Sequence, residues 1–521
     1  MSEKIYSFNQ QDYEFTLRIF NGKNDVFLTM EAWEDLLIEE DIFDWKMKGS
    51  VVIKTPYESF ELESDESNAA TGLSKEKSVY KFRNDGRDTI FISIKPKQSG
   101  DIELKDSVWR LELEAVIYDT EDLSGTRISD KAKKLFFWDK TYQFMIECNS
   151  DFSTATSGVN KGKKGLDQMS NSEKSMKTGE CLGELLKSRP EFEKHAKNVP
   201  DTNNTDKEAE KRKKQLWDVG SEKVKLFYSS PVYSKYIDDL EYLLNYCVSS
   251  EEEGHQPCIF KLERAEKTMK PKQFTLKSIR KYFEKAGKKD AKDYQIEHLY
   301  IESQASDEQP HIEKAPVNKN EQKEIKANRY SVITSYQMSD MSGLDYSQNL
   351  TNYRVVSFNS SEGQFNEESK SHGIEEYKNF YKDNIFDNVL TKNKEERLNM
   401  TKYLKDGMNT KTVYSLRSDE LGRLADGKNR LLKHYLFSNM AITFTILGMT
   451  LRQPGRFFGL SKMGGNNKEY DSKIEGQYFV TNVVHHFNNA QKTYNTQVIG
   501  VKTHTYKEET KFEPDDVIII K

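Results

Sequence analysis

Two long segments near the end of the chain constrain its fold more than any other feature. Gln477–Phe487 and Tyr494–Tyr506 alternate apolar and polar residues, which is typical of strands with one buried face. A short amphipathic helix leads into Met440–Gly448, and a turn at Gln453–Gly455 follows that stretch. We therefore expect a helix that leads into a small antiparallel barrel, and nothing in this region resembles a reaction centre.

The composition describes a polar chain with folded cores. Of its 521 residues, 36% are hydrophobic, 31% are charged and 12% are aromatic, including 27 Tyr and 28 Phe. This aromatic content favours extensive β structure over wholesale disorder, and the length suits about three or four domains. The formal net charge of −5 gives no sign of a general positive field for binding nucleic acid or phospholipid.

Cysteine usage and hydrophobic patterning predict a soluble protein that is not secreted by the general route. Cys148, Cys181, Cys247 and Cys258 show no close spacing typical of metal or redox pairs, so we expect buried free thiols in a reducing cytoplasm. The first residues lack the apolar core of a signal peptide. No run approaches the ~18 apolar residues that a helix needs to cross a bilayer, so we expect no membrane span.

Residues 1–155 are predicted to form an N-terminal β-barrel. Alternation at period two marks strands that have one buried side and one side facing solvent or a partner. About six or seven such strands are enough to close a barrel or a small sandwich. The segments with the clearest alternation are Tyr13–Phe20, Val51–Ile53, Thr89–Ile94, Trp109–Glu114 and Tyr142–Glu147.

Residues 156–328 are predicted to be a mixed α/β module with polar linkers. Tyr236–Cys247 carries apolar residues at i, i+3, i+7 and i+10 of one helix face. Asp201–Lys214 is almost entirely polar, which favours a mobile connection. The other expected elements are helices Thr178–Leu186 and Phe274–Phe283 and strands Cys258–Leu262 and Tyr294–Ile301.

The remaining residues are predicted to form a charged, partly helical insertion over 329–410, then a helix plus a C-terminal β-barrel over 411–521. Tyr353–Phe358 has the pattern of a strand, Glu375–Lys405 is charged and mostly helical, and Ser418–Leu436 places apolar residues at helical spacing. The predicted fold class is therefore α+β and multi-domain. It contains two related antiparallel β-barrels with a mixed α/β module and charged insertions between them.

The sequence carries no motif for phosphate, dinucleotide, zinc-protease or serine-hydrolase chemistry. Gly464 and Gly465 lie in a polar loop with no helix start behind them, which suggests loop flexibility. Carboxylate clusters are expected by chance at this charge content, and basic runs without aromatic residues predict solvated loops. We therefore predict no catalytic residue, no cofactor-binding residue and no metal ligand. The clusters considered are Glu39–Asp41, Glu251–Glu253, Asp515–Asp516, Lys161–Lys164 and Lys211–Lys214.

His485 and His486 are the most tempting pair of metal ligands. Adjacent residues of a strand point to opposite faces, so these two cannot easily bind one ion. Packed or interface histidines are the default expectation. An ion site that gathers His485, His486 or His504 at a symmetry axis stays open. Alternation groups His485 with Phe479, Thr481, Val483 and Phe487, and His486 with Tyr478, Val480 and Val484.

The order of elements from Asn429 to Tyr506 carries a resemblance to a known family. Asn429–Leu460, Gly476–Phe487 and Tyr494–Tyr506 follow one another as helix, strand, Pro-Gly turn, strand, variable loop, a long strand with a histidine near its end, and a closing strand. In this order the chain resembles the central baseplate hub protein of contractile-tailed bacteriophages. The helix Tyr236–Cys247 with the strand after it resembles that family's mixed α/β module. The N-terminal unit then resembles the first of two tail-tube-like barrels.

The resemblance implies a structural virion protein without catalysis of its own. It implies a homotrimer whose two barrels per chain form a pseudo-sixfold ring, which adapts a threefold central spike to a sixfold tail tube. The implied partners are the central spike protein, the tail tube and the baseplate wedge proteins, with DNA passing through the channel without specific binding. The implied location is the tail baseplate of a virion that is assembled in the host cytoplasm.

Other functions stay open at this point. The chain could be another phage tail component, such as a tube initiator or a spike-like protein. It could also be a cell-wall hydrolase with its active site in residues 156–328. Salt-sensitive retention of DNA through Lys211–Lys214 would instead indicate a nucleic-acid-binding protein.

Overall fold

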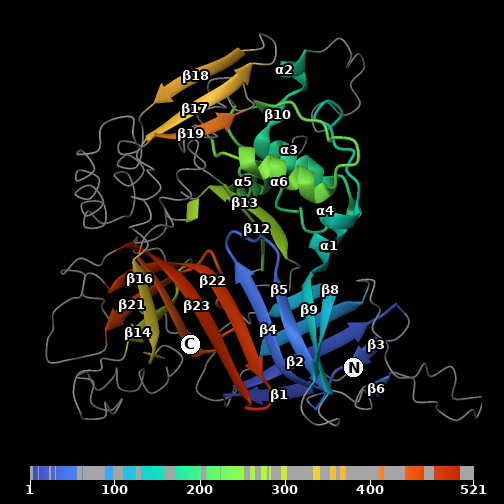
Figure 1. Cartoon of the computed structure of the whole chain (residues 1–521), viewed down its shortest axis with the longest axis vertical. Helices are drawn as coiled ribbons and strands as arrows, with labels where there is room; N and C mark the ends of the chain where they lie inside the picture. Colours follow the sequence, from blue (N-terminus) through green and yellow to red (C-terminus); the bar gives the residue numbers. More distant parts are fainter. Residues whose placement is uncertain are drawn as a thin grey trace, which may run out of the picture.

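Strands dominate the part of the chain that the structure describes. Within that part the protein is mostly β-sheet with a few short helices. In the computed structural model (Figure 1) the helices gather at one end of a large sheet. The residues described are 4–9, 11–22, 25–29, 31–54, 61–62, 88–97, 110–124, 131–157, 160, 170–200, 207–222, 225–250, 258–264, 272–278, 281–282, 295–301, 332–340, 352–359, 364–370, 410–415, 440–462 and 474–504.

The N-terminal strands form one antiparallel run. They are β1 (Lys4–Phe8), β2 (Gln11–Phe20), β3 (Asp25–Phe27), β4 (Trp33–Asp41), β5 (Lys48–Lys54), β6 (Glu61–Leu62), β7 (Thr89–Pro96), β8 (Leu111–Ser124) and β9 (Lys131–Asp139). Along the sheet the order is β4-β5-β9-β8-β7-β2, and both β1 and β3 pair with β2. The predicted strands at Tyr13–Phe20, Val51–Ile53 and Thr89–Ile94 are confirmed, and Trp109–Glu114 overlaps the start of β8.

The C-terminal strands form a mixed run, because β14 is parallel to both of its neighbours. They are β14 (Gln295–Ile301), β15 (Val332–Ile333), β16 (Tyr336–Asp340), β20 (Met440–Leu447), β21 (Phe457–Lys462), β22 (Gly476–Asn488) and β23 (Thr493–His504). Their order is β15-β14-β21-β22-β23-β20-β16. The two long predicted strands are confirmed as β22 and β23, and β14 confirms the predicted strand Tyr294–Ile301. The predicted helices Glu375–Lys405 and Ser418–Leu436 lie outside the described residues.

A seam between β4 and β22 joins the two runs edge to edge. Asn482–Asn488 of β22 pairs antiparallel with Asp35–Asp41 of β4, and Figure 1 shows these strands side by side. The result is one 16-stranded sheet. The described pairings do not close it into two separate barrels, so the two related barrels stay a prediction.

The aromatic core of the N-terminal run is completed from across the seam. Phe487 and Tyr494, from the C-terminal hairpin, are fully buried in the same cluster as Phe8, Phe15 and Trp33. The rings of Phe487 and Tyr494 stack at 3.9 Å, and the ring of Phe8 lies 5.6 Å from that of Phe487. Because aromatic side chains bury large areas, the N-terminal run depends on the end of the chain for its core.

A β-bulge in β22 changes which side chains share a face. The pairing with β23 shifts register between Val480 and Asn482, and a bulge of this kind inserts one residue into one strand. Tyr478 and Val480 therefore pack in the same core as Val483. The predicted grouping of Phe479 with His485 is wrong, and so is that of Tyr478 and Val480 with His486, because strict alternation ignores the inserted residue.

The helices form a second core with two small two-stranded sheets, β10-β11 and β12-β13. This module contains α1 (Lys140–Glu147), α2 (Asn171–Lys174), β10 (Met176–Lys177), α3 (Thr178–Lys187), α4 (Pro190–Glu193), α5 (Lys207–Leu216), β11 (Lys225–Leu226), α6 (Tyr236–Tyr246), β12 (Cys258–Glu263) and β13 (Gln273–Ser278). Predicted helices α3 and α6 and predicted strand β12 are confirmed. On α6 the fully buried face is Tyr236, Asp239, Leu240 and Leu243.

A separate three-stranded sheet contains β17 (Asn352–Asn359), β18 (Gln364–Lys370) and β19 (Thr410–Ser415). The central strand β17 confirms the predicted strand Tyr353–Phe358, and it pairs antiparallel with β18 and parallel with β19. The domain limits proposed from the sequence stay predictions.

Two segments adopt the opposite secondary structure to the one predicted. Tyr142–Glu147 is part of helix α1, because the Asp139 side chain caps it by accepting from the Thr141 amide at 2.8 Å. Thr141 and Met145, one turn apart, form its buried face. The predicted helix Phe274–Phe283 begins instead as strand β13, which is buried on both sides and therefore lacks the alternation that marks a strand.

The predicted mobile connection Asp201–Lys214 is also partly wrong. Residues from Lys207 onward form helix α5, whose last turn leads into the buried Trp217. Lys213 and Lys214 lie in that last turn, where cations stabilise the negative end of the helix dipole. The basic run Lys211–Lys214 is therefore helical rather than a loop.

Replacing Phe487 by Ala should lower the free energy of unfolding by about 3–5 kcal/mol, since removing a fully buried aromatic ring leaves a cavity. Urea denaturation followed by tryptophan fluorescence measures this change. Hydrogen exchange should show the loss of protection in β1 and β2, far away in sequence. Val484→Ala, on the outer face of the same strand, is the control and should cost about 1 kcal/mol or less. Unchanged protection in β1 and β2 of the Phe487 variant would contradict a shared core.

Candidate functional site

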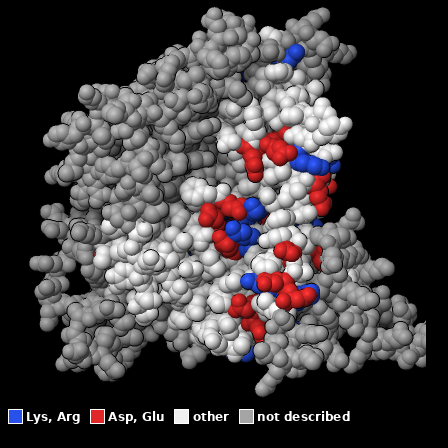
Figure 2. Space-filling model, viewed as in Figure 1, with Lys and Arg blue, Asp and Glu red and all other residues white. Residues whose placement is uncertain are grey.

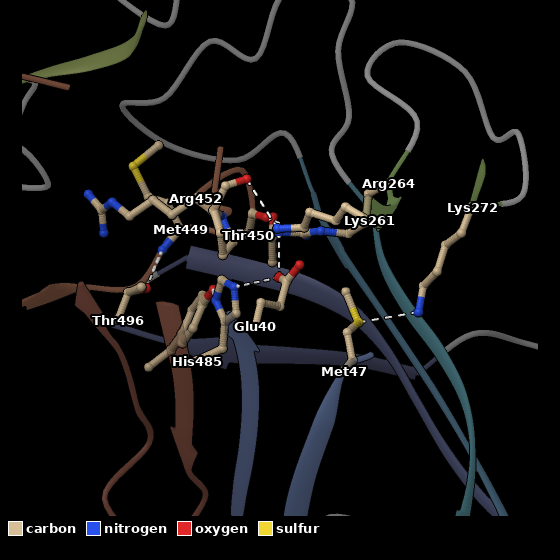
Figure 3. A network of polar contacts seen from close by, with 12 residues as sticks. Glu40, Met47, Lys261, Arg264, Lys272, Met449, Thr450, Arg452, His485 and Thr496 are labelled. Atoms are coloured by element: carbon tan, nitrogen blue, oxygen red, sulfur yellow. Dashed lines mark hydrogen bonds and ion pairs between the residues drawn. The ribbon is translucent and has the colours of Figure 1, made fainter. Parts of the chain in front are cut away.

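The most unusual site in the described structure is a buried cluster of charged residues where three parts of the chain meet. Glu40 lies on β4, Lys261 on β12 and Arg264 directly after β12, while Arg452 lies in the loop between β20 and β21 and His485 on β22. Their exposed fractions are 0–5%. Figure 3 shows the side chains of Glu40, Arg264 and His485 pointing toward one another, whereas the guanidinium of Arg452 points away from Glu40. We call this cluster the buried junction.

Arg264 makes contacts with two of those parts at once. Its Nη2 lies 2.8 Å from Oε1 of Glu40, which forms an ion pair with the N-terminal sheet. Its Nη1 donates to the carbonyl oxygen of Thr450 at 2.7 Å, and Nη2 also donates to that of Arg452 at 2.9 Å. A planar guanidinium suits such a fork, because its donors are fixed in direction. One side chain of the helical module therefore fastens the seam strand β4 to the C-terminal loop.

The loop between β20 and β21 is also held by hydrogen bonds to its backbone groups. Lys261 donates from Nζ to the carbonyl of Pro454 at 3.2 Å. Gly455 donates to the carbonyl of Val480 at 2.9 Å, and Val480 donates back to Arg456 at 2.8 Å. Gly455 has a φ of +85°, which favours glycine because a side chain strains that conformation. The Pro-Gly turn in the sequence is thus the point at which this loop docks onto the junction.

His485 and Glu40 contact each other across the two seam strands, β22 and β4. Nδ1 of His485 lies 2.7 Å from the hydroxyl of Tyr494, and Nε2 lies 3.4 Å from Oε1 of Glu40. Burial lowers the pKa of His485, despite the opposing effect of Glu40. Burial raises the pKa of Glu40, but Arg264 and His485 outweigh it and bring the pKa to about 2. At neutral pH we therefore expect an anionic Glu40 beside a neutral His485.

A second carboxylate balances the lysine of the junction. Glu263 contacts Nζ of Lys277 at 2.9 Å through both oxygens and accepts from the Tyr282 hydroxyl at 3.1 Å. Burial raises the pKa of Glu263, but the positive charges of Lys277 and Arg456 outweigh this effect and lower the pKa to about 2. Burial lowers the pKa of Lys261 to about 8, although Glu40 and Glu263 oppose the shift. The cluster therefore holds several charges in a low-dielectric environment, in which Arg264 pairs with Glu40 and Lys277 pairs with Glu263.

The chemistry of the junction is that of a structural lock. Its carboxylates are bound by cations on neighbouring elements, and its cations reach carbonyl oxygens of the docked loop. An ion pair of this kind adds little net stability over apolar residues, but it fixes one arrangement, because any shift leaves a buried charge unpaired. In the part of the chain described, no group of three or more His, Cys, Asp or Glu residues is placed to hold a metal ion.

The structure separates the two histidines as their positions on one strand predict. His485 is fully buried in the junction, whereas Nε2 of His486 contacts Oδ1 of Asp35 at 2.5 Å on the outer face of the seam. The hydrogen bond to Asp35 raises the pKa of His486. His504 pairs with Gln477 at the far end of β22 and β23. An ion at a symmetry axis between copies is not tested by these contacts.

Other predicted candidates fall into three groups. Of the cluster Glu39–Asp41, only Glu40 faces inward, while Glu39 contacts Lys48 at 3.4 Å on the outer face. The four cysteines are free thiols, and all but Cys148 are fully buried, as predicted. The candidates outside the described residues are Gly464, Gly465, Lys161–Lys164, Glu251–Glu253 and Asp515–Asp516.

Sequence reasoning missed Glu40, Lys261 and Arg264 as a site. One signal was present: in β4 the alternation Leu36, Ile38, Glu40 places a carboxylate at a core position. A buried charge requires a partner, so this position predicts a cation elsewhere in the fold. No pattern in the sequence indicates that the cation is Arg264, 224 positions further along the chain.

Comparisons with known proteins give similarity to solved structures only. No protein-family model and no curated protein matches the chain. A tail protein from Neisseria meningitidis MC58 is 10% identical with a TM-score of 0.44, over 94% of this chain and 99% of that one. The 43 kDa tail protein of prophage MuSo2 from Shewanella oneidensis is 6% identical with a TM-score of 0.44, over 94% and 98%. The E. coli c3393 protein, a type VI secretion component, is 7% identical with a TM-score of 0.36, over 94% and 77%.

Replacing Arg264 by Met should lower the free energy of unfolding by about 3–5 kcal/mol, because Glu40 is left buried without its main counter-charge. Chemical denaturation measures the loss. The double variant Arg264→Met/Glu40→Gln should lose less than the sum of the two single variants. Lys48→Met on β5 is the control. It removes an exposed ion pair with Glu39, the neighbour of Glu40 on β4, and should cost about 0–1 kcal/mol. Equal losses for Arg264→Met and Lys48→Met would contradict a buried junction.

Acid should destabilise the protein through Glu40. Its pKa is about 2 when folded against an ordinary value of 4.5, so its stabilising contribution is complete above pH 4.5 and is lost as the pH falls toward 2. The free energy of unfolding of Glu40→Gln should therefore change less between pH 5 and 2 than that of the wild type. Denaturation curves at several pH values test this expectation, with Glu39→Gln as the control from the outer face. Parallel pH profiles for wild type and Glu40→Gln would refute it.

Proposed function

We propose that this chain is a structural protein of a phage-tail-like assembly, and more specifically the trimeric hub of a baseplate. The observation that carries the proposal is the seam, in which β4 and β22 join two β runs of one chain into a continuous sheet. The sequence resemblance to baseplate hubs over Asn429–Tyr506 agrees with it. The tail and secretion proteins named above are similar in overall chain path but supply no residue-level argument.

The seam suits a protein that converts threefold into sixfold symmetry. One chain with two β units joined edge to edge supplies two positions of a ring, so three chains supply six. A threefold spike could then bind one side of the ring and a sixfold tube the other. The baseplate wedge proteins would bind at the periphery, and DNA would pass through the channel without specific binding. The assembled hub would belong to the tail baseplate of a virion built in the host cytoplasm.

The buried junction fits the mechanical demands of such a ring. Arg264 and Lys261 fasten the helical module to both sides of the seam through Glu40 and the carbonyls of the C-terminal loop. A rigid connection lets the module keep a fixed orientation when neighbouring proteins bind or contract. The helical module would therefore be held against the ring rather than tethered to it.

Two alternatives make different demands on the molecule. A tube initiator or a spike-like protein would share the strands but not the ring of six units. A cell-wall hydrolase would need an accessible carboxylate pair in residues 156–328. Within that range the pKa of the described carboxylate Glu263 is lowered to about 2, and this carboxylate is bound by Lys277 and Tyr282. On the face in Figure 2 the described acidic and basic side chains are intermixed, which does not suggest a nucleic-acid-binding groove there.

No helix in the described part is long and apolar enough to cross a membrane.

Native mass spectrometry of the purified chain tests the proposal, and a mass of three chains is the expected result. Incubation with purified peptidoglycan should release no soluble fragments. A monomer at all concentrations, or hydrolysis that a single carboxylate variant abolishes, would overturn the proposed hub.

A further inference from the structure

The two β runs repeat one four-stranded unit. In the N-terminal run four strands lie in the order β4-β5-β9-β8, which we call the first unit. In the C-terminal run four strands lie in the order β16-β20-β23-β22, which we call the second unit. The chain passes through the strands of both units in the same sequence, and every pairing within both units is antiparallel.

The register of the strands agrees between the units as well as their order. A row of residues that lie opposite one another can be followed across all four strands of each unit. Because register decides which side chains share a face, matching rows assign a counterpart to each residue, and Leu36 corresponds to Tyr336. The matching rows are Leu36–Val51–Leu135–Thr120 in the first unit and Tyr336–Phe444–Val498–Val483 in the second.

A β-bulge lies at the same position of both long hairpins. The pairing of β8 with β9 shifts register between Ile117 and Asp119, and that of β22 with β23 shifts between Val480 and Asn482. Before the bulge, β8 pairs with β7, and β22 pairs with β21. The amides of Ile117 and Val480 each donate at 2.8 Å to the residue that precedes β7 or β21. After the bulge, β22 pairs with β4 and forms the seam, as expected of a bulge that ends one pairing and bends the strand.

The seam joins the last strand of the second unit, β22, to the first strand of the first unit, β4. The counterparts of these two strands are β8 and β16. Among the described pairings, β8 has only β9 beside it after the bulge, and β16 has only β20. The two strands lie at opposite ends of the joined units, and Figure 1 shows β16 toward the left and β8 toward the right. They therefore do not meet within one chain.

Corresponding residues on β4 and β16 differ in exposure in the way that a missing neighbour predicts. Leu36 is 0% exposed, and it lies opposite Phe487 in the seam and in the same core. Its counterpart Tyr336 is 40% exposed, although Phe444 opposite it on β20 is buried. An exposed aromatic ring at the edge of a sheet is unfavourable in water and favours pairing with a further strand.

We propose that β8 of one copy pairs with β16 of a second copy of this chain, in the geometry that the seam has within each chain. The inference rests on the homotrimer of the proposed function and names the strands that would hold it together. The second copy is the occupant that fits, because the two strands are the counterparts of the two seam strands. Two different edges joined head to tail close into a ring when the rotation between copies fits, and backbone hydrogen bonds of strand addition supply the contact.

The register of the seam carries over to this contact. Transferred to the corresponding strands, it predicts three antiparallel pairs: Asp122–Met338, Leu123–Gln337 and Ser124–Tyr336. The carboxylate of Asp122 has a cation within its own hairpin, since Lys133 lies 2.7 Å away. The three residues of β16 are uncharged, so these pairs place no like charges opposite each other.

A disulfide across the predicted register tests the contact. Leu123→Cys/Gln337→Cys places two thiols opposite each other on neighbouring copies, and mild oxidation should give covalent trimers on a non-reducing gel. Asp122→Cys/Gln337→Cys is the matched control, because Asp122 and Leu123 point to opposite faces of the strand. It should cross-link at least tenfold less. The four native cysteines are the same in both variants, and three of them are buried.

The exposed ring of Tyr336 gives a second, independent test. Tyr336→Glu should weaken association at least tenfold in a dilution series followed by mass photometry, because it places a charge where the neighbouring strand would lie. Phe20→Glu, on β2, changes an aromatic residue of similar exposure away from both edges and should associate like the wild type. Circular dichroism spectra of both variants should match that of the wild type, since neither ring is buried.

The outcomes separate this contact from the proposed function. Covalent trimers of the matched pair alone, together with weakened trimers of Tyr336→Glu, support the contact. A trimeric wild type that shows neither effect, or equal cross-linking of both cysteine pairs, would overturn the contact and leave the trimeric hub intact. A wild type that stays monomeric at all concentrations would overturn both.

Discussion

The ion pair between Arg264 and Glu40 is the interaction on which the arrangement of the described parts depends. It crosses from the helical module to the seam strand, and the same guanidinium binds the carbonyls of the loop between β20 and β21. Removing two charges from water is costly, and the cost is offset only where geometry and hydrogen bonds are good. The ion pair and the carbonyl contacts of Arg264 therefore favour one packing of module, seam and loop.

A second constraint is the aromatic core that spans the seam. Phe487 and Tyr494 complete a cluster built from nearly every strand of the N-terminal run, with β2, β4, β7 and β8 contributing most of its residues. The beginning of the chain and its C-terminal hairpin therefore fold around each other. Contacts between residues so distant in sequence form slowly, because the entropy of closing a long loop is lost before these contacts stabilise the fold. The seam pairing and the shared core together make the two β runs one cooperative structure. In the proposed hub, this unity is what would keep two ring positions in fixed register.

Sequence reasoning succeeded where local pattern and tertiary environment agree. β2, β23 and the second half of β22 have one buried and one outer face, so their alternation predicts them well. It failed where a local contact or double burial overrode the pattern: Asp139 caps a helix at Tyr142–Glu147, and β13 is covered on both sides. The bulge between Val480 and Asn482 inserts one residue, so a strict period of two assigns side chains on either side of it to the wrong face. The partner of Glu40 could not be predicted, because pairing over such a distance leaves no periodic signal.

An electron cryomicroscopy map of the assembled chain tests the proposed hub most directly. We expect three copies around a threefold axis, with the N-terminal and C-terminal β runs of each copy alternating as six similar positions of one ring. We also expect the β4–β22 seam to lie within each copy rather than between copies. A map with the two runs in unrelated positions, or with no ring at all, would contradict the hub.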